Sequence, residues 1–492
     1  MAGKDYREDN SVNSTRSQYR SRNRNRKNNN FNGLIILAII LIGAIFVGSR
    51  FLIRHMKKNN TVAATNKGDG SINTDSLDTS VAVEEAESTS SALEVALNTA
   101  KKQAMQYDYD AAIATLNELN MPDNAEVTSA ISEYEGIKAN LVPANMDDIT
   151  HVFFHTMVVD VDRALRDTHQ GRQWNSVMTT IPEFKEILQQ MYDRGYVMVH
   201  LHDIAQMQDQ GDGTMKMVKN QIMLPEGKIP FVMSQDDVNY YIYMENHGFP
   251  DKMVLDENGK LKNQYTDAQG NVTVGDYDLV PILDAFVEEH PDFAYHGHKA
   301  IIALTGYNGV LGYRTDETFD PNSPAFDPNN KPNHNIEEDR STVRTLTSAL
   351  KQDGYEFASH SWGHINFKGR SLGIIQNDTD KWIRNVGHLL PDPCEILIYP
   401  FGADIGDWHP YQAGHQEGKF DYLESVGFRY FCNVDSKRAW LQYGDNFFRQ
   451  GRRNLDGYRL YEGYSGKADR LSDIIDVTKV FDTSRPTPIN WE

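Results

Sequence analysis

Cysteine is nearly absent from this chain of 492 residues, which has only Cys394 and Cys432. Two cysteines exclude a multi-disulfide scaffold and any zinc site built on paired Cys-x-x-Cys motifs. Both residues fall in stretches that have the apolar patterning of strands. Two interpretations are equally open: a single disulfide between them, or two buried free thiols.

Positive charge is scarce outside the amino terminus. The whole chain has 49 Lys/Arg against 69 Asp/Glu, which gives a formal net charge of −20. The first 58 residues carry twelve basic and three acidic side chains, a balance of +9, so the remainder carries −29. An acidic body of this size repels phosphate groups, which argues against nucleic acid as a partner.

Long apolar runs are also scarce, and only one is long enough to cross a membrane. It extends without a charge from Gly33 to Ser49, and residues 51–53 lengthen it. About 20 such residues span a hydrocarbon core of about 30 Å. The segment SRFLIRHMKK that follows lacks the small residues of a signal-peptidase site. We therefore expect an uncleaved anchor over residues 33–54, with a processed signal or a buried core helix as the alternatives.

The segments around this run differ in composition. Residues 1–32 are basic and are expected to be a cytoplasmic tail, although basic residues flank both ends of the run and favour this orientation only slightly. Residues 59–91 are rich in small polar and acidic residues, which indicates a solvated linker. Residues 92–142 have apolar side chains at helical spacing, and YDYDAAIATL resembles a tetratricopeptide-type helix junction. We expect a helical spacer there, with a module that contacts another protein as the alternative.

Strand-like and helical segments alternate from residue 149 onward, which predicts an α/β domain with a mainly parallel sheet or barrel. The expected strands are HVFFHTM, YVMVHL, IPFVMS, KAIIALT, YEFAS, EILIYP and FRYFCNV, and helices are expected over 181–194, 279–289 and 336–352. This rhythm is typical of a (β/α) barrel, whose functional side chains gather at the carboxyl ends of the strands. Insertions are expected near 256–275, as a hairpin, and near 305–335, as a long polar loop.

Polar clusters follow three of the expected strands. They are Ser234-Gln235-Asp236-Asp237, His360-Ser361-Trp362-Gly363-His364 and Tyr399-Pro400-Phe401-Gly402. Each alone is a weak signal, because an HxxxH pair usually marks a surface helix and the other two usually mark turns. Together, and in this order, they are a strong signal, because a barrel brings these strand ends to one rim.

The histidine pair suggests a metal site. Histidines at i and i+4 can direct two imidazoles to one side of a helical turn, and Asp237 could complete a two-His, one-carboxylate set with His360 and His364. Zinc is the expected ion, with cobalt, nickel, manganese or iron(II) as alternatives. The second carboxylate, Asp236, could accept a proton from a water that attacks a carbonyl group.

These motifs resemble those of the polysaccharide deacetylases, carbohydrate esterase family four, which share the NodB-homology domain. LPEGKIPFVMSQDDV looks like the first motif, SHSWGH is similar to H-[ST]-x-x-H, and YPFG is similar to the third, over residues 149–482. The resemblance implies a distorted (β/α) barrel that removes N-acetyl or O-acetyl groups from a cell-surface or cell-wall glycan. It therefore also implies that this domain lies outside the cell, on a single-pass anchor.

By position, the resemblance implies a role for each motif residue. The general base would be Asp236, and the metal ligands would be Asp237, His360 and His364. The backbone N–H of Phe401 would donate to the oxyanion. The residues that bind the substrate would be Tyr399, Pro400 and Trp440.

Three departures from the family pattern affect the predicted chemistry. Val238 stands where a glycine usually follows the aspartates. The arginine that usually orients the base is replaced by Ile398, so another cation must do this work. The usual general-acid histidine is missing, because no histidine follows Asn433. The proton would then come from a metal-bound water, from His155 or from His409, and an ester substrate would tolerate the loss more easily than an amide.

Two other functions therefore stay open beside the enzyme. One is a carbohydrate-binding pseudoenzyme, and the other is a surface scaffold with an inactive deacetylase fold. Outside the motifs, His296 and His298 precede an expected strand and should lie at the opposite, structural end of the barrel. No partner is predicted for His151 or His202, and Trp174 and Trp382 are expected in the core.

Overall fold

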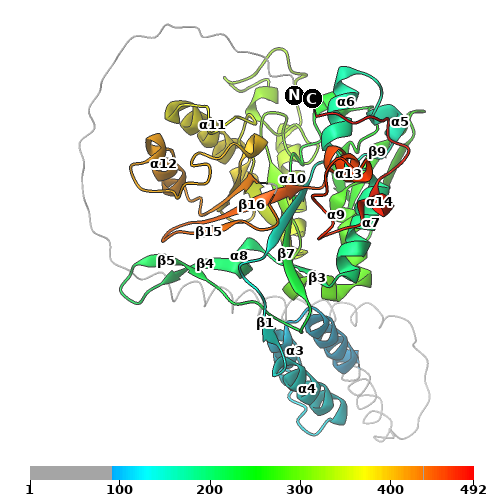
Figure 1. The fold of residues 1–492 in the computed structure, drawn as a ribbon, viewed down its shortest axis with the longest axis vertical. Helices are drawn as coiled ribbons and strands as arrows, with labels where there is room; N and C mark the ends of the chain where they lie inside the picture. The colour runs from blue at the N-terminus through cyan, green and yellow to red at the C-terminus, as the bar shows by residue number, and fades with distance from the viewer. Residues whose placement is uncertain (1–90, 436, 492) are drawn as a thin grey trace, which may run out of the picture. The chain divides into compact units, whose positions relative to one another are not determined.

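The computed structural model describes residues 91–435 and 437–491 (Figure 1). The predicted basic tail over 1–32, the anchor over 33–54 and nearly all of the linker over 59–91 lie outside these residues. Among the helices that are described, none is both long and apolar enough to cross a bilayer.

Seven parallel strands close into a ring. In ring order they are β2 (Thr150–Phe154), β7 (Ile229–Gln235), β11 (Ile301–Leu304), β12 (Glu356–Ser359), β13 (Ile396–Ile398), β14 (Tyr430–Val434) and β16 (Phe448–Asn454). The ring closes because β2 pairs with both β16 and β7, with Arg452 opposite His151 and Phe153 opposite Ser234. The predicted barrel is thus confirmed as a closed parallel barrel with flanking helices.

The strand β16 was not predicted, and the predicted strand YVMVHL lies outside the ring. That segment forms β3 (Tyr196–Met198), which pairs with the first residues of β7, while β11 pairs with the last residues of β7. A further short strand, β15 (Leu441–Tyr443), runs antiparallel along β16.

Helices cover the outside of the ring (Figure 1). The main ones are α7 (Ile181–Asp193), α9 (Leu279–Glu289), α10 (Ile336–Gln352), α11 (Leu372–Asn385), α12 (Lys419–Ser425) and α13 (Gly457–Tyr464). Their apolar stripes pack against the outward side chains of the strands in one large core. Trp382 is fully buried there and donates to the Leu304 carbonyl over 2.7 Å, and Trp174 is buried in a smaller cluster, so both are core residues as predicted.

The helical segment before the barrel packs onto the amino-terminal end of the ring. It comprises residues 91–105, α3 (Tyr109–Asn117) and α4 (Ala125–Lys138). The hydroxyl of Tyr107 donates to the Asp292 carbonyl over 2.8 Å, and the His296 N–H donates to the Gln106 carbonyl over 2.7 Å. The apolar side chains of this helical segment belong to the same buried cluster as side chains of the barrel interior. The segment and the barrel therefore form one compact unit.

Smaller elements decorate the barrel. A hairpin joins β4 (Ala205–Asp209) to β5 (Met215–Lys219), β1 (Val142–Pro143) pairs with β6 (Met223–Leu224), and a three-stranded antiparallel sheet contains β8 (Lys252–Leu255), β9 (Leu261–Thr266) and β10 (Val272–Gly275). Residues 305–335 are mostly irregular. Both cysteines are free thiols, which excludes the disulfide interpretation.

A buried ion pair fixes the carboxyl-terminal segment to α7. Arg485 donates to both carboxylate oxygens of Glu183, over 2.7 and 2.5 Å, and both side chains are fully buried. The same carboxylate accepts the N–H groups of Thr180 and Asp482, so it also caps α7. One side chain therefore holds the start of a helix and the end of the chain together.

The Arg485→Met variant is expected to lose about 3–5 kcal/mol of unfolding free energy, because Glu183 would stay buried without a counter-charge. Urea unfolding followed by circular dichroism measures this loss. Arg470→Met is a matched control, since the Arg470 side chain is 49% exposed and lies 3.7 Å from Glu462; it should cost less than about 1 kcal/mol. Similar losses for the two variants would contradict the assigned role of the buried pair.

Candidate active site

The three predicted motifs meet at the carboxyl end of the barrel. Asp236 and Asp237 follow β7, His360 and His364 follow β12, and Phe401 follows β13. One ligand atom from each of Asp237, His360 and His364 lies within 4.8 Å of the others. The sequence-predicted metal ligands are therefore brought together, as parallel strand ends require.

The orientation of both histidines suits metal binding. The ring nitrogen Nδ1 of His360 lies 2.8 Å from the Ile398 carbonyl, and since a carbonyl can only accept, Nδ1 donates to it and Nε2 is the nitrogen that could bind an ion. Burial lowers the pKa of His364 to about 4, so its imidazole is neutral at pH 7. Two imidazoles beside a carboxylate are a donor set that fits zinc and similar divalent ions.

Asp237 is held as an ionised ligand by its neighbours. Burial opposes its ionisation, but His364, His360 and a hydrogen bond from Tyr241 outweigh burial, so the pKa of Asp237 is lowered. The Tyr241 hydroxyl lies 2.6 Å from Oδ1, which leaves Oδ2 facing His364 Nε2 at 3.9 Å. The carboxylate is thus oriented before any ion binds.

The motif loops contain left-handed backbone at functional residues. Positive φ angles occur at Asp237 (60°), Ser361 (60°), His364 (52°) and Phe401 (61°), conformations that cost a non-glycine residue about 1–3 kcal/mol. The buried carboxylate of Asp378 offsets this cost in the histidine loop by accepting the N–H groups of residues 362 and 363, each over 2.8 Å. Such strain is typical of sites where geometry is imposed by function.

The third motif exposes one aromatic ring and buries another. Phe401 is 55% exposed and its ring packs edge-to-face on His364 at 4.5 Å. Its backbone N–H donates to no acceptor in residues 91–435 or 437–491, as an oxyanion donor requires. Gly402 is needed beside it, because a Cβ there would lie 2.7 Å from Val434 Cβ.

The other predicted substrate-binding residues lie elsewhere. Tyr399 is fully buried and shares a 2.8 Å hydrogen bond with the Tyr411 hydroxyl, and Pro400 is buried too. Trp440 packs against the guanidinium of Arg449, 5.0 Å from its ring centre. Within this motif, Phe401 is therefore the exposed aromatic residue and Tyr399 is a core residue.

Sequence reasoning missed the cation that orients Asp236. Arg452, on β16, donates to both carboxylate oxygens of Asp236 over 2.7 and 2.9 Å, and both side chains are almost fully buried. Burial alone would raise the pKa of Asp236, but the Arg452 guanidinium outweighs it, with His360 adding to the effect, and holds this pKa far below its usual range. A cation therefore reaches Asp236 from β16, whereas β13 carries Ile398.

A polar chain through the barrel interior supports Arg452. Its guanidinium also donates to Ser234 Oγ over 3.1 Å, and that hydroxyl lies 2.9 Å from His151 Nε2. His151 Nδ1 lies 3.2 Å from Gln450 Oε1. The partner that the sequence did not reveal for His151 is thus this buried network, which joins β2, β7 and β16.

Of the two proposed proton donors, His155 lies at the site. It follows β2, whose last residue, Phe154, accepts the N–H of Asp236 over 2.8 Å. Its Nδ1 donates to the Val177 carbonyl over 3.1 Å, which fixes the orientation of the ring. His409 is exposed on a loop, with its ring against Trp408.

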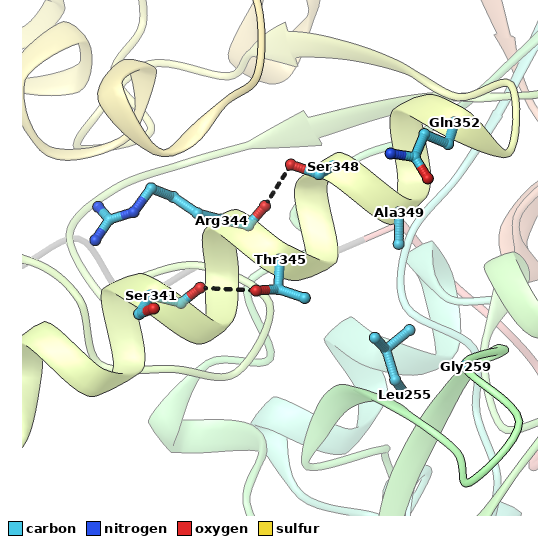
Figure 2. A pocket seen from close by; sticks show the side chains of 8 residues that line it. All are labelled: Leu255, Gly259, Ser341, Arg344, Thr345, Ser348, Ala349 and Gln352. Atoms are coloured by element: carbon cyan, nitrogen blue, oxygen red, sulfur yellow. Dashed lines mark hydrogen bonds between the residues drawn. The ribbon is translucent and has the colours of Figure 1, made fainter. Parts of the chain in front are cut away.

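One surface groove of the protein lies away from this site. It has a volume of about 560 Å³ and lies between α10 and the turn that joins β8 to β9 (Figure 2). Its only charged lining residue is Arg344. Without a cluster of titratable groups, it has no means of acid–base or metal chemistry.

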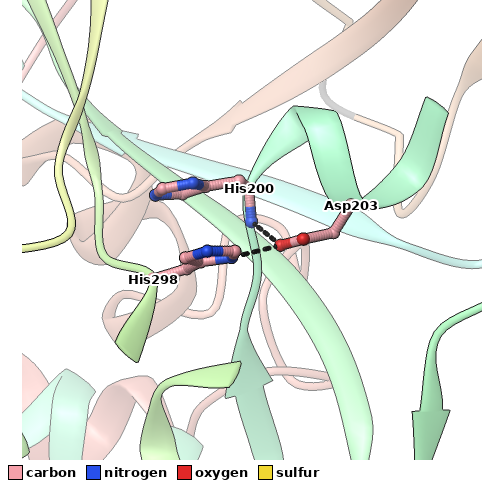
Figure 3. A group of neighbouring side chains, drawn as sticks. All are labelled: His200, Asp203 and His298. Atoms are coloured by element: carbon pink, nitrogen blue, oxygen red, sulfur yellow. Dashed lines mark hydrogen bonds and ion pairs between the residues drawn. The ribbon is translucent and has the colours of Figure 1, made fainter. Parts of the chain in front are cut away.

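A second histidine cluster lies at the amino-terminal end of the barrel, where the sequence placed His298. The rings of His200 and His298 stack with their centres 4.0 Å apart and their planes 4° from parallel, and Asp203 lies at their edge (Figure 3). His298 Nδ1 lies 2.7 Å from Asp203, and His200 Nε2 donates to the Gly354 carbonyl. Imidazole lone pairs lie in the ring plane, so two parallel rings cannot converge on one ion. We interpret the cluster as a structural network.

His202 extends this network by an ion pair. Its Nδ1 is hydrogen-bonded to Glu356 and its Nε2 lies 3.2 Å from Glu395. Burial acts to lower the pKa of His202, but the hydrogen bonds to these carboxylates outweigh it and raise the pKa to about 10. Because the folded pKa lies above the ordinary value of 6.5, the stabilisation is complete below about pH 6.5 and is lost as the pH rises towards 10.

The His202→Gln variant should therefore lower the melting temperature most near pH 6, and this loss should shrink steadily towards pH 9.5. Thermal unfolding of the variant and the parent across this range measures the difference. His334→Gln, at an exposed position, is the control and should show no such trend. A loss that is independent of pH would show that His202 contributes packing rather than charge.

Comparisons with known proteins add little at the level of sequence, since no family model and no curated protein matches this chain. Among solved structures, it is similar to the deacetylase PplD from Streptococcus pyogenes (11% identity, 65% of this chain and 95% of that one, TM-score 0.31). It is also similar to a de-N-acetylase from Aggregatibacter actinomycetemcomitans (13%, 66% and 99%, 0.34) and to IcaB from Ammonifex degensii (11%, 63% and 92%, 0.30). At such values nothing is transferred to individual residues.

Fold and site together define a class of protein. It is a closed parallel barrel whose strand ends bring two histidines and one aspartate within reach of a common ion, beside a second, oriented aspartate.

Proposed function

We propose that this chain is a metal-dependent hydrolase that removes acetyl groups from a cell-surface or cell-wall glycan. The observation that carries the proposal is the division of work between adjacent carboxylates. Asp237 faces the two histidines, whereas Asp236 is held ionised by Arg452 and directs Oδ2 to within 3.9 Å of His360 Nε2. A purely structural ion site has no use for this second carboxylate.

The residues that would hold the ion are Asp237, His360 and His364, and zinc is the ion we propose. The chemistry that such an ion supplies is polarisation of the acetyl carbonyl and acidification of a water molecule. Asp236 accepts the proton of the attacking water. Each carboxylate oxygen of Asp236 keeps a lone pair in addition to the one that accepts from Arg452. The bidentate contact therefore orients the base without blocking it. The free N–H of Phe401 is placed to donate to the oxyanion.

His155 is the proposed proton donor to the leaving group. It takes the place of the family's missing histidine, because Nδ1 is fixed by the Val177 carbonyl and Nε2 is free to carry a second proton. An amide substrate needs such a donor, since an amine leaves poorly without a proton. The presence of His155 supports de-N-acetylation and weakens the case for a pseudoenzyme.

Acetate release by the full chain tests the proposal. The protein would be stripped of metal, resupplied with zinc, cobalt, nickel or manganese, and offered acetylated chito-oligosaccharides, peptidoglycan fragments and an acetyl ester. Metal-dependent release that is lost in His360→Ala supports the proposal. Tight zinc binding without acetate from any substrate would favour the carbohydrate-binding alternative.

We further propose that the barrel acts outside the cell on an anchor over residues 33–54. The proposal is supported by the apolar run in the sequence and by the glycan substrate proposed above. A carboxyl-terminal fusion to a reporter that works only outside the cytoplasm should be active. A fusion to a reporter that works only in the cytoplasm should be inactive.

A further inference from the structure

A row of three tyrosine rings begins at the metal-ligand loop and ends at the surface. Tyr241 is buried, and its ring stacks on Tyr243 (5.0 Å, 15°) and on Tyr307 (5.3 Å, 20°). The Tyr241 hydroxyl donates to Asp237, as described above. Tyr243, at the outer end, is 49% exposed. The row therefore connects a proposed metal ligand to an aromatic ring that solvent can reach.

Exposed aromatic rings border the site from two directions. Tyr243 lies on the segment after β7, whereas Phe401 lies after β13 and packs on His364. In the ring of strands, β11 and β12 separate β7 from β13. The two rings thus lie next to different ligands, Tyr243 beside Asp237 through Tyr241 and Phe401 against His364.

Exposed aromatic rings beside a polar centre suit a sugar. A pyranose has a face of C–H groups that packs on an aromatic ring, while its hydroxyls stay at the edge in water. The acetyl group under attack must lie at the ligands themselves. The Tyr243 ring is separated from Asp237 by the Tyr241 ring. It is therefore placed to contact the neighbouring sugar and not the sugar that loses its acetyl group.

Charge restricts the kind of glycan. The residues after position 58 carry a balance of −29. A polymer with a negative charge on every repeat would be repelled, whereas an uncharged one would not.

We propose that Tyr243 forms a subsite for the sugar next to the acetylated residue, so that the protein prefers uncharged, N-acetylated oligosaccharides over monosaccharides and over polyanionic glycans. This inference rests on the proposed function, whose substrate class it narrows.

Chain-length dependence tests the subsite. Acetylated glucosamine monomer, dimer, tetramer and hexamer would be compared by kcat/KM for acetate release, which should rise with length in the parent. Tyr243→Ala should lose about tenfold on the tetramer, mainly through KM, and little on the monomer. Tyr243→Phe keeps the ring and should stay near the parent. Tyr464→Ala removes another stacked tyrosine, 43% exposed on α13 against Phe481, and should leave the length dependence unchanged.

Two outcomes would overturn the subsite: a parent that acts equally on all lengths, or a Tyr243→Ala loss that is the same for all lengths. If the parent released no acetate at all, the proposed function would fail, and calorimetric binding of the tetramer would decide the subsite separately. Binding that Tyr243→Ala weakens about tenfold supports it, whereas unchanged or absent binding overturns it. A hyaluronan fragment of equal length should bind more weakly than the tetramer, and tighter binding would contradict the charge argument.

Discussion

The Asp236→Asn variant is expected to lose about 10²–10⁴-fold in kcat for acetate release while it still binds zinc. The amide cannot accept a proton from water, but Asp237, His360 and His364 are untouched. KM should change little, because the proposed substrate contacts lie on Phe401 and Tyr243. Steady-state kinetics on the acetylated chito-tetramer, with zinc affinity from calorimetry, would measure the two effects separately.

A fold control is needed, since the substitution leaves Arg452 buried beside a neutral amide. Circular dichroism and thermal unfolding would show whether the variant is folded at the assay temperature. Asp212→Asn, in the exposed turn between β4 and β5, should leave kcat and zinc affinity unchanged. Acetate release by folded Asp236→Asn within threefold of the parent would remove this residue from the role of base.

Loss of the orienting cation is expected to have the second large effect. Arg452→Met leaves the Asp236 carboxylate buried without a counter-charge, which should cost about 3–5 kcal/mol of unfolding free energy. Arg452→Lys keeps the charge but cannot donate in parallel to both oxygens. The lysine variant should therefore recover much of the stability while kcat stays reduced, by up to about 10²-fold.

This split between stability and kcat distinguishes an orienting residue from one that only stabilises the fold. Urea unfolding gives the first quantity and acetate release the second. Arg438→Met is the control, since the Arg438 side chain is 55% exposed in its pair with Asp148, and both quantities should stay near the parent values. If Arg452→Lys restored stability and kcat together, the bidentate geometry would have no part in catalysis.

Much of the barrel was predictable because its helices have strong local signals. The bounds of α9 and α10 agree with the predicted ranges, and α7 differs by one residue at its end. In α7, Thr180 and Glu183 form a capping box, and buried side chains recur at helical spacing after it. Such signals lie within a few residues of each other, so the sequence displays them directly.

The site was predictable where the chemistry lies at the ends of regular strands. Asp236, Asp237, His360 and His364 each follow an apolar strand, and parallel strand ends must share one rim. The burial of Tyr399 was not predictable in the same way. Its ring packs on Phe367 and Phe431, from distant parts of the chain, and nothing local in YPFG shows which of the two aromatic residues points outward.

The strand β16 and the cation Arg452 were not predicted, and both for the same reason. The segment FRQGRRN forms β16, but its inward positions hold Gln450 and Arg452, so it lacks the apolar alternation by which strands are recognised. Those polar side chains are tolerated because the barrel interior offers them partners. A signal was nevertheless present. The motifs contain two adjacent carboxylates, Asp236 and Asp237, and no cation, so a cation had to come from elsewhere in the chain. Arg452 and Arg453 were available for this.

The seam between β16 and β2 has a consequence for how the protein acquires activity. The Arg452–Asp236 contact joins residues 216 apart, and the Gln450 side chain reaches a carbonyl 301 residues away. Contacts of such separation carry a loop-closure cost and form slowly, and during synthesis β16 emerges after every other strand of the ring. A nascent chain thus contains all the recognisable motif residues before Asp236 can have Arg452 as its partner. Closure of the ring has to await β16, so the proposed hydrolysis requires a chain in which β16 has paired with β14 and β2.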